Sequence, residues 1–403
     1  MFDRLGILIG FSIVGVLGAG IFAADVFNLF PRDSFDTALE RVVACTRAKN
    51  ATACSRPAVK EMLGFRSAAE VMDALSVRLT PQQCHHVGHV VGQQSLVLSQ
   101  DLERSVTRCT RTCDSACVHG AIGQAFAQEL GLEDSSGTQD FDLQHLGAEE
   151  ARTIGRRLCV STEACHGVGH VLFQAHGSFE SALSLCREIA AGANRSYCYH
   201  GVYMEYADIL SSREIRPTPN VIYPTPESLD ALCGSQPSFE EKVSCFPYFP
   251  RIVDATFRAR GLSSSSAMAH VRELCAAYPD QADRAACFFG VGFSSSYSLM
   301  EDTLTAVKIC QQFPTPLDRI ACNLGQVSAS TRDRQPEVIA YCAALPDLPS
   351  RTSCYQAVFY YLSRSGTPMQ DAAKLCGGDS VCERESEHYE SVPLERILEG
   401  FGV

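Results

Sequence analysis

The chain has 403 residues, a net charge of −12 at pH 7 and an apolar fraction of 46%. This apolar fraction excludes bulk disorder, and the acidic balance argues against a nucleic-acid partner, because phosphate binding needs a basic surface. The length allows two or three compact domains or one elongated array of repeats.

The N-terminal segment is the first predicted element. Residues 5–24 are apolar and carry no charged side chain. At about 1.5 Å of rise per residue, this stretch spans about 30 Å, the thickness of one hydrocarbon core. A cleaved signal peptide is the alternative, but its apolar region is usually only about 7–15 residues long. We predict one transmembrane helix within residues 1–32. Both interpretations place residues 33–403 outside the cytoplasm.

The cysteines support that location. There are twenty, and most of them fall into regular pairs. Such thiols stay reduced inside cells, whereas an exported protein oxidises them. A protein with many zinc ions is the alternative, but the short Cys-x-x-Cys pairs that zinc sites favour are absent. The sequence therefore predicts disulfides and a periplasmic or extracellular location.

Within residues 33–210, predicted to be histidine-bearing helical repeats, one pattern occurs twice. The first copy, residues 84–130, contains Cys-His-His-Val-Gly-His at 84 and Cys-Val-His-Gly at 117. The second copy, residues 159–210, contains Cys-His-Gly-Val-Gly-His at 165 and Cys-Tyr-His-Gly at 198. Nine of the eleven histidines lie between residues 85 and 200. The aligned pairs are His85 with His166, His89 with His170, and His119 with His200.

These histidines have the spacing of a metal site. Histidines four residues apart share one face of a helix and can bind one ion together. In later repeats the position of His119 holds Pro247, Phe289, Leu324 or Gln356, so packing alone does not require histidine there. With the cysteines oxidised, the donors are nitrogen and oxygen, which favours zinc or copper. The predicted ligands form two groups, His85, His89, His119 and His166, His170, His200, with Glu205 as a further ligand or general base.

Three alternatives to a metal site stay open. Histidines at helix starts can be structural, capping helices or satisfying buried carbonyl groups. Covalent c-type haem requires Cys-x-x-Cys-His, which is absent, and nothing favours a non-covalent haem between two histidines. An enzyme that uses a histidine and Glu205 as an acid–base pair without metal is the third alternative.

A proline-rich segment follows. Residues 211–228 contain four prolines and are predicted to be an insertion that does not form regular helix. We place the boundary between the histidine-bearing repeats and the histidine-poor repeats, residues 229–403, at this insertion.

From residue 186 onward, cysteines recur in pairs twelve residues apart. Each first cysteine closes a predicted helix, a loop with Pro or Asp follows, and the second cysteine opens another helix. A disulfide needs Cα atoms about 4.4–6.8 Å apart, which adjacent ends of a helical hairpin supply. The sequence therefore predicts an all-α solenoid of αα-hairpin repeats, stapled by disulfides. The regular pairs are Cys186–Cys198, Cys233–Cys245, Cys275–Cys287, Cys310–Cys322 and Cys342–Cys354; the other predicted pairs are Cys45–Cys54, Cys109–Cys117, Cys159–Cys165, Cys376–Cys382 and, by elimination, Cys84–Cys113.

The Cys-x11-Cys pairs between predicted helices resemble the stapled helical repeats of exported Sel1-like and tetratricopeptide-like proteins, over roughly residues 186–382. This resemblance of architecture implies a concave surface and protein–protein binding, and implies nothing about the histidines.

The leading hypothesis is an extracytoplasmic, membrane-anchored helical-repeat protein that binds a transition metal through its histidines, with metal-dependent catalysis as an extension. The alternative is a non-enzymatic scaffold for protein assembly at the membrane, with structural histidines. The predicted partners are the membrane, through the N-terminal helix, and a protein on the solenoid surface. No nucleic-acid partner is predicted.

Overall fold

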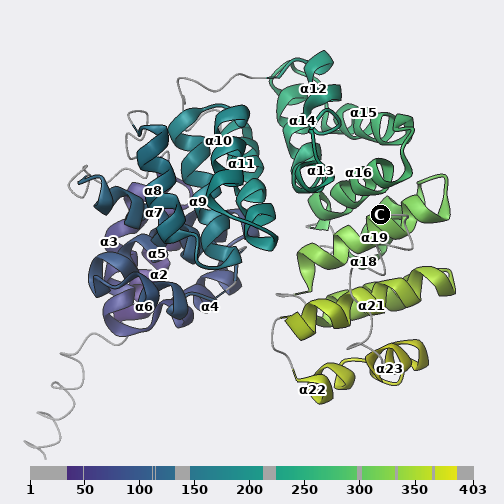
Figure 1. Cartoon of the computed structure of the whole chain (residues 1–403). Coiled ribbons are helices and arrows are strands. Elements are labelled where there is room, and N and C mark those ends of the chain that lie inside the picture. The colour runs from purple at the N-terminus through teal and green to yellow at the C-terminus, as the bar shows by residue number, and fades with distance from the viewer. Residues whose placement is uncertain are drawn as a thin grey trace, which may run out of the picture.

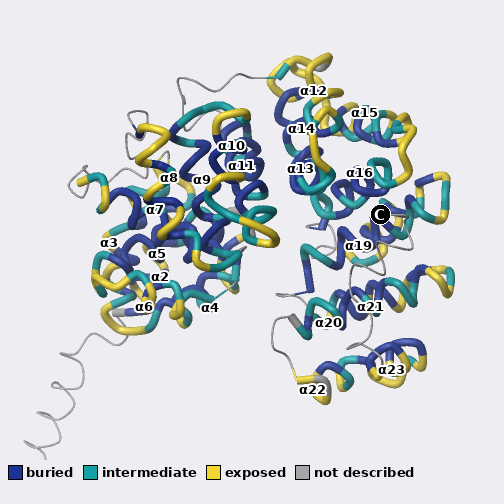
Figure 2. The backbone as a smooth tube through the Cα atoms, viewed as in Figure 1, coloured by how far each residue is buried: buried dark blue, intermediate teal, exposed yellow. Residues whose placement is uncertain are grey.

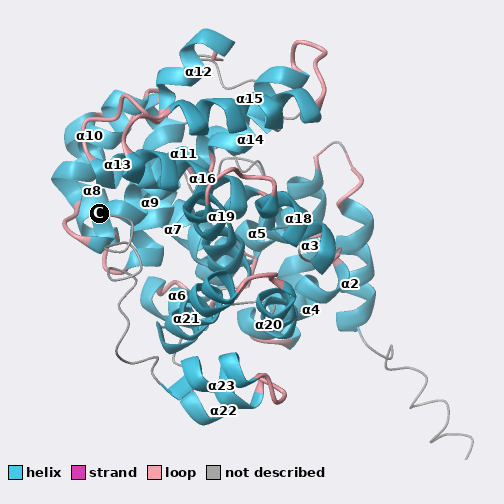
Figure 3. Ribbon diagram, turned by 90° about the vertical axis from the view of Figure 1, so that its right-hand side faces the viewer, coloured by secondary structure: helices cyan, strands magenta, loops and turns pink. Residues whose placement is uncertain are grey.

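A computed structural model describes residues 34–48, 50–110, 112–113, 115–131, 146–211, 224–296, 302–331, 335–364 and 368–387. Within these ranges all regular secondary structure is helical, as Figure 3 shows, so the all-α prediction is confirmed. The predicted transmembrane segment, residues 5–24, lies outside the described residues. Among the helices that are described, none is both long and apolar enough to cross a bilayer.

The helices form consecutive hairpins, each made of a first helix (the A helix) and a second helix (the B helix). Each B helix packs against its own A helix and against the B helix of the next hairpin. The A helices are α2 (Ser34–Cys45), α4 (Ala68–Arg78), α6 (Leu102–Arg108), α8 (Ala148–Leu158), α10 (Phe179–Ile189), α12 (Pro226–Leu232), α15 (Ser264–Ala277), α18 (Thr303–Gln311), α20 (Gln335–Ala344) and α22 (Met369–Lys374). The B helices are α3 (Ala51–Phe65), α5 (Pro81–Ser99), α7 (Ala116–Glu129), α9 (Thr162–His176), α11 (Ala193–Ser211), α13 (Phe239–Cys245) with α14 (Phe249–Arg258), α16 (Gln281–Ser294), α19 (Pro316–Ser330), α21 (Leu348–Arg364) and α23 (Ser380–Glu387).

The array runs in two parts in Figure 1: α2 to α11 occupy the left of the view, and α12 to α23 descend on the right. Buried positions follow α9, α11 and α16, whereas α12 and α22 are largely exposed (Figure 2). Packing continues across the predicted proline-rich insertion, because α11 contacts α13 and α14. Helix α12 begins at Pro226, inside that predicted insertion, because the Thr225 hydroxyl accepts the backbone N–H of Ser228 at 3.3 Å.

All twenty cysteines are paired in ten disulfides, and every predicted pair is confirmed, including Cys84–Cys113. Nine of them join the end of an A helix to the first turns of its B helix; Cys84–Cys113 instead joins α5 to the segment before α7. The prediction that the second cysteine opens the B helix is wrong, because the helix begins before that cysteine. In α16, for example, the helix begins six residues before Cys287, because the Asp280 carboxylate caps it.

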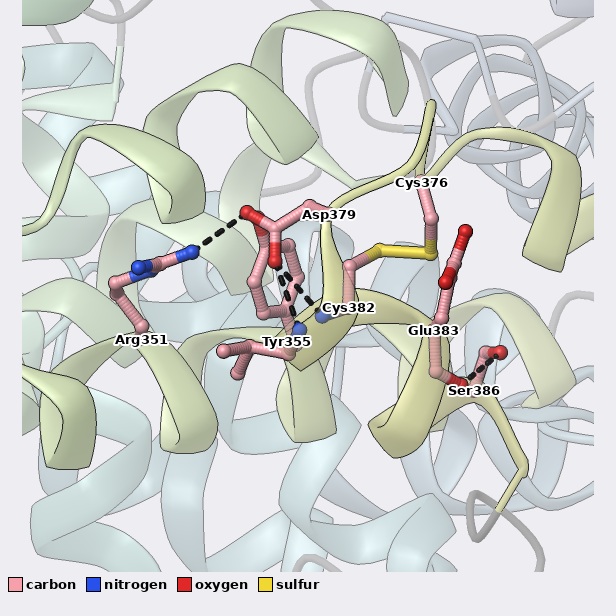
Figure 4. The surroundings of a disulfide bond; sticks show 8 residues. Arg351, Tyr355, Cys376, Asp379, Cys382, Glu383 and Ser386 are labelled. Carbon is pink, nitrogen blue, oxygen red and sulfur yellow. Dashed lines mark hydrogen bonds and ion pairs between the residues drawn. A yellow bond between two sulfur atoms is a disulfide. The ribbon is translucent and has the colours of Figure 1, made fainter.

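The last staple, Cys376–Cys382, has a polar counterpart (Figure 4). Between the two cysteines, the Asp379 carboxylate accepts the backbone N–H groups of Val381 and Cys382 at 2.9 and 3.1 Å. The same carboxylate pairs with Arg351 of α21 at 2.6 Å. This single side chain therefore caps the start of α23 and ties the final hairpin to the preceding B helix.

Glycine lets successive B helices touch backbone to backbone. In four hairpins the residue three positions after the second cysteine is glycine, and a Cβ added there would lie within 2.1 Å of a carbonyl oxygen on the preceding B helix. Because real Cβ atoms never approach so closely, glycine is required at each crossing. The crossings are Gly120 on the His89 carbonyl, Gly201 on His166, Gly290 on Phe246 and Gly325 on Phe289.

The crossing of α7 over α5 gives a first prediction. We expect Gly120→Ala to lower the free energy of unfolding by about 3 kcal/mol, because its methyl group would force the two backbones apart. Gly123→Ala is the matched control in the same helix: a Cβ there meets nothing within 4 Å. It should stabilise the protein by up to about 1 kcal/mol through helix propensity. Urea unfolding followed by circular dichroism measures both, and equal stability of the two variants would contradict the role of the crossing.

Candidate metal centre

Five of the six predicted histidine ligands lie together on three successive B helices, α5, α7 and α9 (Figure 1). Centroids of neighbouring rings in this histidine cluster are 4.6–6.0 Å apart. Two groups of three each offer ligand nitrogens within 4.8 Å of one another. The first group is His85, His89 and His119; the second is His119, His166 and His170.

Helix caps fix where the paired histidines stand. Helix α5 begins at Pro81 because the Thr80 hydroxyl accepts the N–H of Gln83 and the Gln83 side chain accepts the N–H of Thr80. His85 and His89 then fall one turn apart on the face that meets α7. Helix α9 is capped by the Ser161 hydroxyl, which accepts the N–H of Ala164, and carries His166 and His170 in its second and third turns.

The first pair already has nearly the spacing of two ligands on one ion. His85 is buried and donates its Nδ1–H to the carbonyl oxygen of Cys113 at 3.0 Å, which leaves its Nε2 with a lone pair. That Nε2 lies 3.1 Å from Nε2 of His89. Two nitrogens bound to tetrahedral zinc at about 2.0–2.1 Å stand about 3.3 Å apart.

The carbonyl that orients His85 lies in a constrained segment. Cys113 and Ser115 have φ values of +56° and +58°, in the left-handed region that residues other than glycine rarely adopt. Such conformations cost about 1–3 kcal/mol each and persist when the surroundings impose them. Here the disulfides Cys84–Cys113 and Cys109–Cys117 hold the chain at Cys113 itself and two residues after Ser115. The acceptor of His85 is therefore fixed by covalent bonds.

In the second group a carboxylate, and not a backbone carbonyl, accepts the hydrogen bond that orients the histidine. His170 donates its Nδ1–H to Glu205 of α11 at 2.7 Å, and Gln174 donates to the other carboxylate oxygen at 2.8 Å. His170 and Glu205 are 3% and 5% exposed, so water does not screen their interaction. A carboxylate on the far nitrogen fixes the tautomer of a metal-ligating histidine and raises its basicity. Glu205 thus lies behind a ligand and not among the ligands themselves.

In the cluster, Nδ1 of His119 and Nε2 of His170 are buried and have no hydrogen-bond partner. Leaving a buried polar atom unsatisfied costs about 1–3 kcal/mol. A bound cation would supply the missing partner to both. The chemistry of these donors therefore fits a metal ion.

The charge state of the cluster also suits a cation. Burial holds the pKa of His119 well below its usual value, and the neighbouring histidines lower it further, so the ring is neutral at pH 7. Asp208, one turn beyond Glu205 on α11, is close enough to interact electrostatically with the histidine rings of the cluster. Burial would raise its pKa, but Arg251 above all, and then His85 and His170, keep it below the usual value. Two carboxylates of α11 therefore place negative charge beside the cluster.

His200 lies outside the cluster, although its position in the repeat matches that of His119. This position points forward to the next B helix in the array. From α7 it faces α9, which carries histidines, whereas from α11 it meets Tyr248 in the next hairpin, with ring centroids 5.9 Å apart. The predicted grouping of His166, His170 and His200 is therefore replaced by one in which His119 takes the third place.

Sequence reasoning missed three groups at this site. Gln174 stands four residues after His170, and Asp208 three residues after Glu205, so both share a helix face with a predicted site residue. That spacing is a signal which could have found them. The Cys113 carbonyl has no such signal, because a backbone acceptor is not visible in residue types.

Comparison with protein-family models, curated proteins and solved structures finds no match to this chain. Its chemistry must be judged from the donors themselves. Neutral imidazoles with no thiolate in reach suit zinc, copper, nickel or iron, and their affinity is highest for copper in the divalent series.

Buried histidines make stability depend on pH. Burial lowers the pKa of His200 from 6.5 to about 4, so below pH 6.5 the unfolded chain binds a proton that the folded chain does not. This histidine should therefore cost about 3 kcal/mol of stability as the pH falls from about 6.5 to 4. We expect His200→Gln to remove that part of the loss in metal-free protein, measured by urea unfolding across this range. His270→Gln, at a half-exposed position, is the control; an unchanged pH profile in His200→Gln would contradict the prediction.

Proposed function

We propose that this chain is an extracytoplasmic helical-repeat protein that binds a transition metal, zinc or copper, in the histidine cluster of α5, α7 and α9. One observation supports the proposal most: imidazoles from three helices converge while two buried nitrogens, His119 Nδ1 and His170 Nε2, keep no hydrogen-bond partner. Histidines that served packing alone would be expected to satisfy these atoms.

The surroundings of the cluster support the same conclusion. One histidine in each group is oriented by an acceptor on its far nitrogen: the Cys113 carbonyl for His85 and the Glu205 carboxylate for His170. Such outer acceptors accompany nearly all metal-ligating histidines. The ten disulfides indicate an oxidising compartment, and they also explain why a metal site here uses nitrogen donors only.

Access and anchoring complete the proposal. His89 and His166 are half-buried, whereas the other three rings are buried, so we propose that a small molecule would approach the metal at these two rings. Metal-dependent catalysis is a proposed extension, with Glu205 acting through His170. We also propose that residues 5–24 hold the chain at a membrane and that the solenoid surface binds a protein partner.

Metal content tests the main proposal. Full-length protein purified without a histidine tag from an oxidising compartment, and exposed to zinc or copper, should carry the metal after desalting. His166→Ala combined with His170→Ala should lower the bound metal by at least half, because these rings belong to the second group. His200→Ala is the matched control, a histidine at an equivalent repeat position outside the cluster, and should retain it. Elemental mass spectrometry gives the content of each protein.

Absence of metal in the wild-type protein under these conditions would sink the proposal. The remaining interpretation would then be the scaffold, with histidines that serve the fold.

The disulfide beside His85 provides an independent test. Replacing Cys84 and Cys113 together by serine frees the segment whose carbonyl orients His85, so metal affinity should fall about tenfold or more. Replacing Cys376 and Cys382 by serine removes a disulfide at the far end of the array and is the control. Competition with a chromophoric chelator measures both affinities. Equal losses in the two variants would mean that the Cys84–Cys113 disulfide has no special role at the site.

A further inference from the structure

The five rings of the cluster fall into two donor sets that share one member. His119 belongs to both, with centroids 5.7 Å from His85 and from His89 on one side. On the other side, the ring centroid of His119 is 4.6 Å from that of His166 and 4.9 Å from that of His170. His119 lies on the middle one of the three helices, so it is the only cluster residue between the two histidine pairs.

Each set has the dimensions of a complete site. Rings bound to one tetrahedral zinc have centroids about 5.2 Å apart, given bonds of about 2.0–2.1 Å. The centroid distances are 4.7, 5.7 and 5.7 Å in the first set and 4.6, 4.9 and 5.0 Å in the second. Both sets therefore surround a space of the right size for an ion without help from the other.

Each set also has its own outer acceptor. The Cys113 carbonyl orients His85 in the first set, and the Glu205 carboxylate orients His170 in the second. Such an acceptor orients an individual ligand. Because the two acceptors come from different elements of the fold, each set has an oriented ligand that does not depend on the other set.

We propose that the cluster holds two transition-metal ions, one in each set, with His119 giving one ring nitrogen to each. This inference rests on the proposed function and specifies the number of ions. When the second ion binds, the remaining ring N–H of His119 loses its proton to solvent, and the electron pair of that bond becomes the second metal–nitrogen bond. One proton is released and no electron is transferred.

The two positions differ in affinity. The second set has a carboxylate behind His170, whereas the first set has a neutral carbonyl behind His85, so the second set offers the more basic ligand and a compensating negative charge. One feature opposes this order: the rings of His119 and His166 are parallel within 4°, so their in-plane lone pairs do not meet at one point. One ring must turn about its Cβ–Cγ bond, but that torsion is broad and the turn costs little. The second set therefore fills first.

Titration of the full-length, metal-free protein with Cu²⁺ tests the proposal. We expect two equivalents, bound in two steps, by isothermal calorimetry and native mass spectrometry. The first equivalent should give a full electron paramagnetic resonance signal. The second should reduce the integrated signal, because copper ions that share one imidazole ring couple antiferromagnetically.

Variants assign the steps. His166→Gln should leave one equivalent at the weaker affinity, and His89→Gln one equivalent at the tighter affinity. Glu205→Gln should weaken the tight step about 10–100-fold and leave the other unchanged. His119→Ala should abolish the magnetic coupling, whereas His200→Ala should preserve both steps and the coupling.

The outcomes separate this inference from the proposed function. A single equivalent in the wild-type protein, lost in every cluster variant, would overturn the two-ion arrangement and leave the metal-binding proposal intact. No binding at all would overturn both. Two equivalents without coupling would exclude a shared His119. The stoichiometry and coupling of the wild-type protein decide the matter even where a variant does not fold.

Discussion

The backbone-to-backbone crossing of successive B helices is the contact on which the rest of this molecule depends. In four hairpins a disulfide fixes the start of the B helix against its A helix, and three residues further on a glycine packs against a backbone carbonyl of the preceding B helix. The two residues between cysteine and glycine are then held at both sides. In α7 the second of these residues is His119, and the next residue, Gly120, packs on the His89 carbonyl. In the motif Cys-x-His-Gly, the cysteine and the glycine therefore have structural roles, whereas packing does not require the histidine.

Five imidazoles packed together are tolerable only while most of them are neutral, because each added proton would be buried beside the others. The low pKa of His119 shows this cost directly. A divalent cation would add charge to the same space, but there Glu205 and Asp208 stand close by, and lone pairs point at the ion instead of at protons. The arrangement that resists protonation is therefore the one that we propose to bind a metal. Disulfides elsewhere in the array supply stability that can offset the unsatisfied nitrogens within the cluster.

The pattern of cysteines predicted the hairpins that are joined by a pair twelve residues apart, because such a pair leaves few geometries for the chain between. The other five disulfides were predicted from pairs at other spacings and, for Cys84–Cys113, by elimination. The i, i+4 spacing likewise predicted that His85 and His89 share a face. The third ligand of the second set could not be predicted in this way. Alignment shows that His119 and His200 hold equivalent positions in their hairpins, but the neighbour each one faces belongs to the following hairpin. Only the order of packing decides that one meets histidines and the other Tyr248.

The two copies of the motif differ in a second way that their sequences barely show. Helix α7 crosses α5 at Gly92, eight residues after Cys84, whereas α11 crosses α9 at Gly169, four residues after Cys165. The crossing in the first copy is therefore displaced by one helical turn, about 5.4 Å. This displacement accompanies the one disulfide that is not a hairpin staple, Cys84–Cys113, which ties α5 to the segment before α7. A strict repeat would give each copy the same contacts. By departing from it, the chain brings one histidine of the first copy between both pairs, and the two copies of the motif contribute to one histidine cluster.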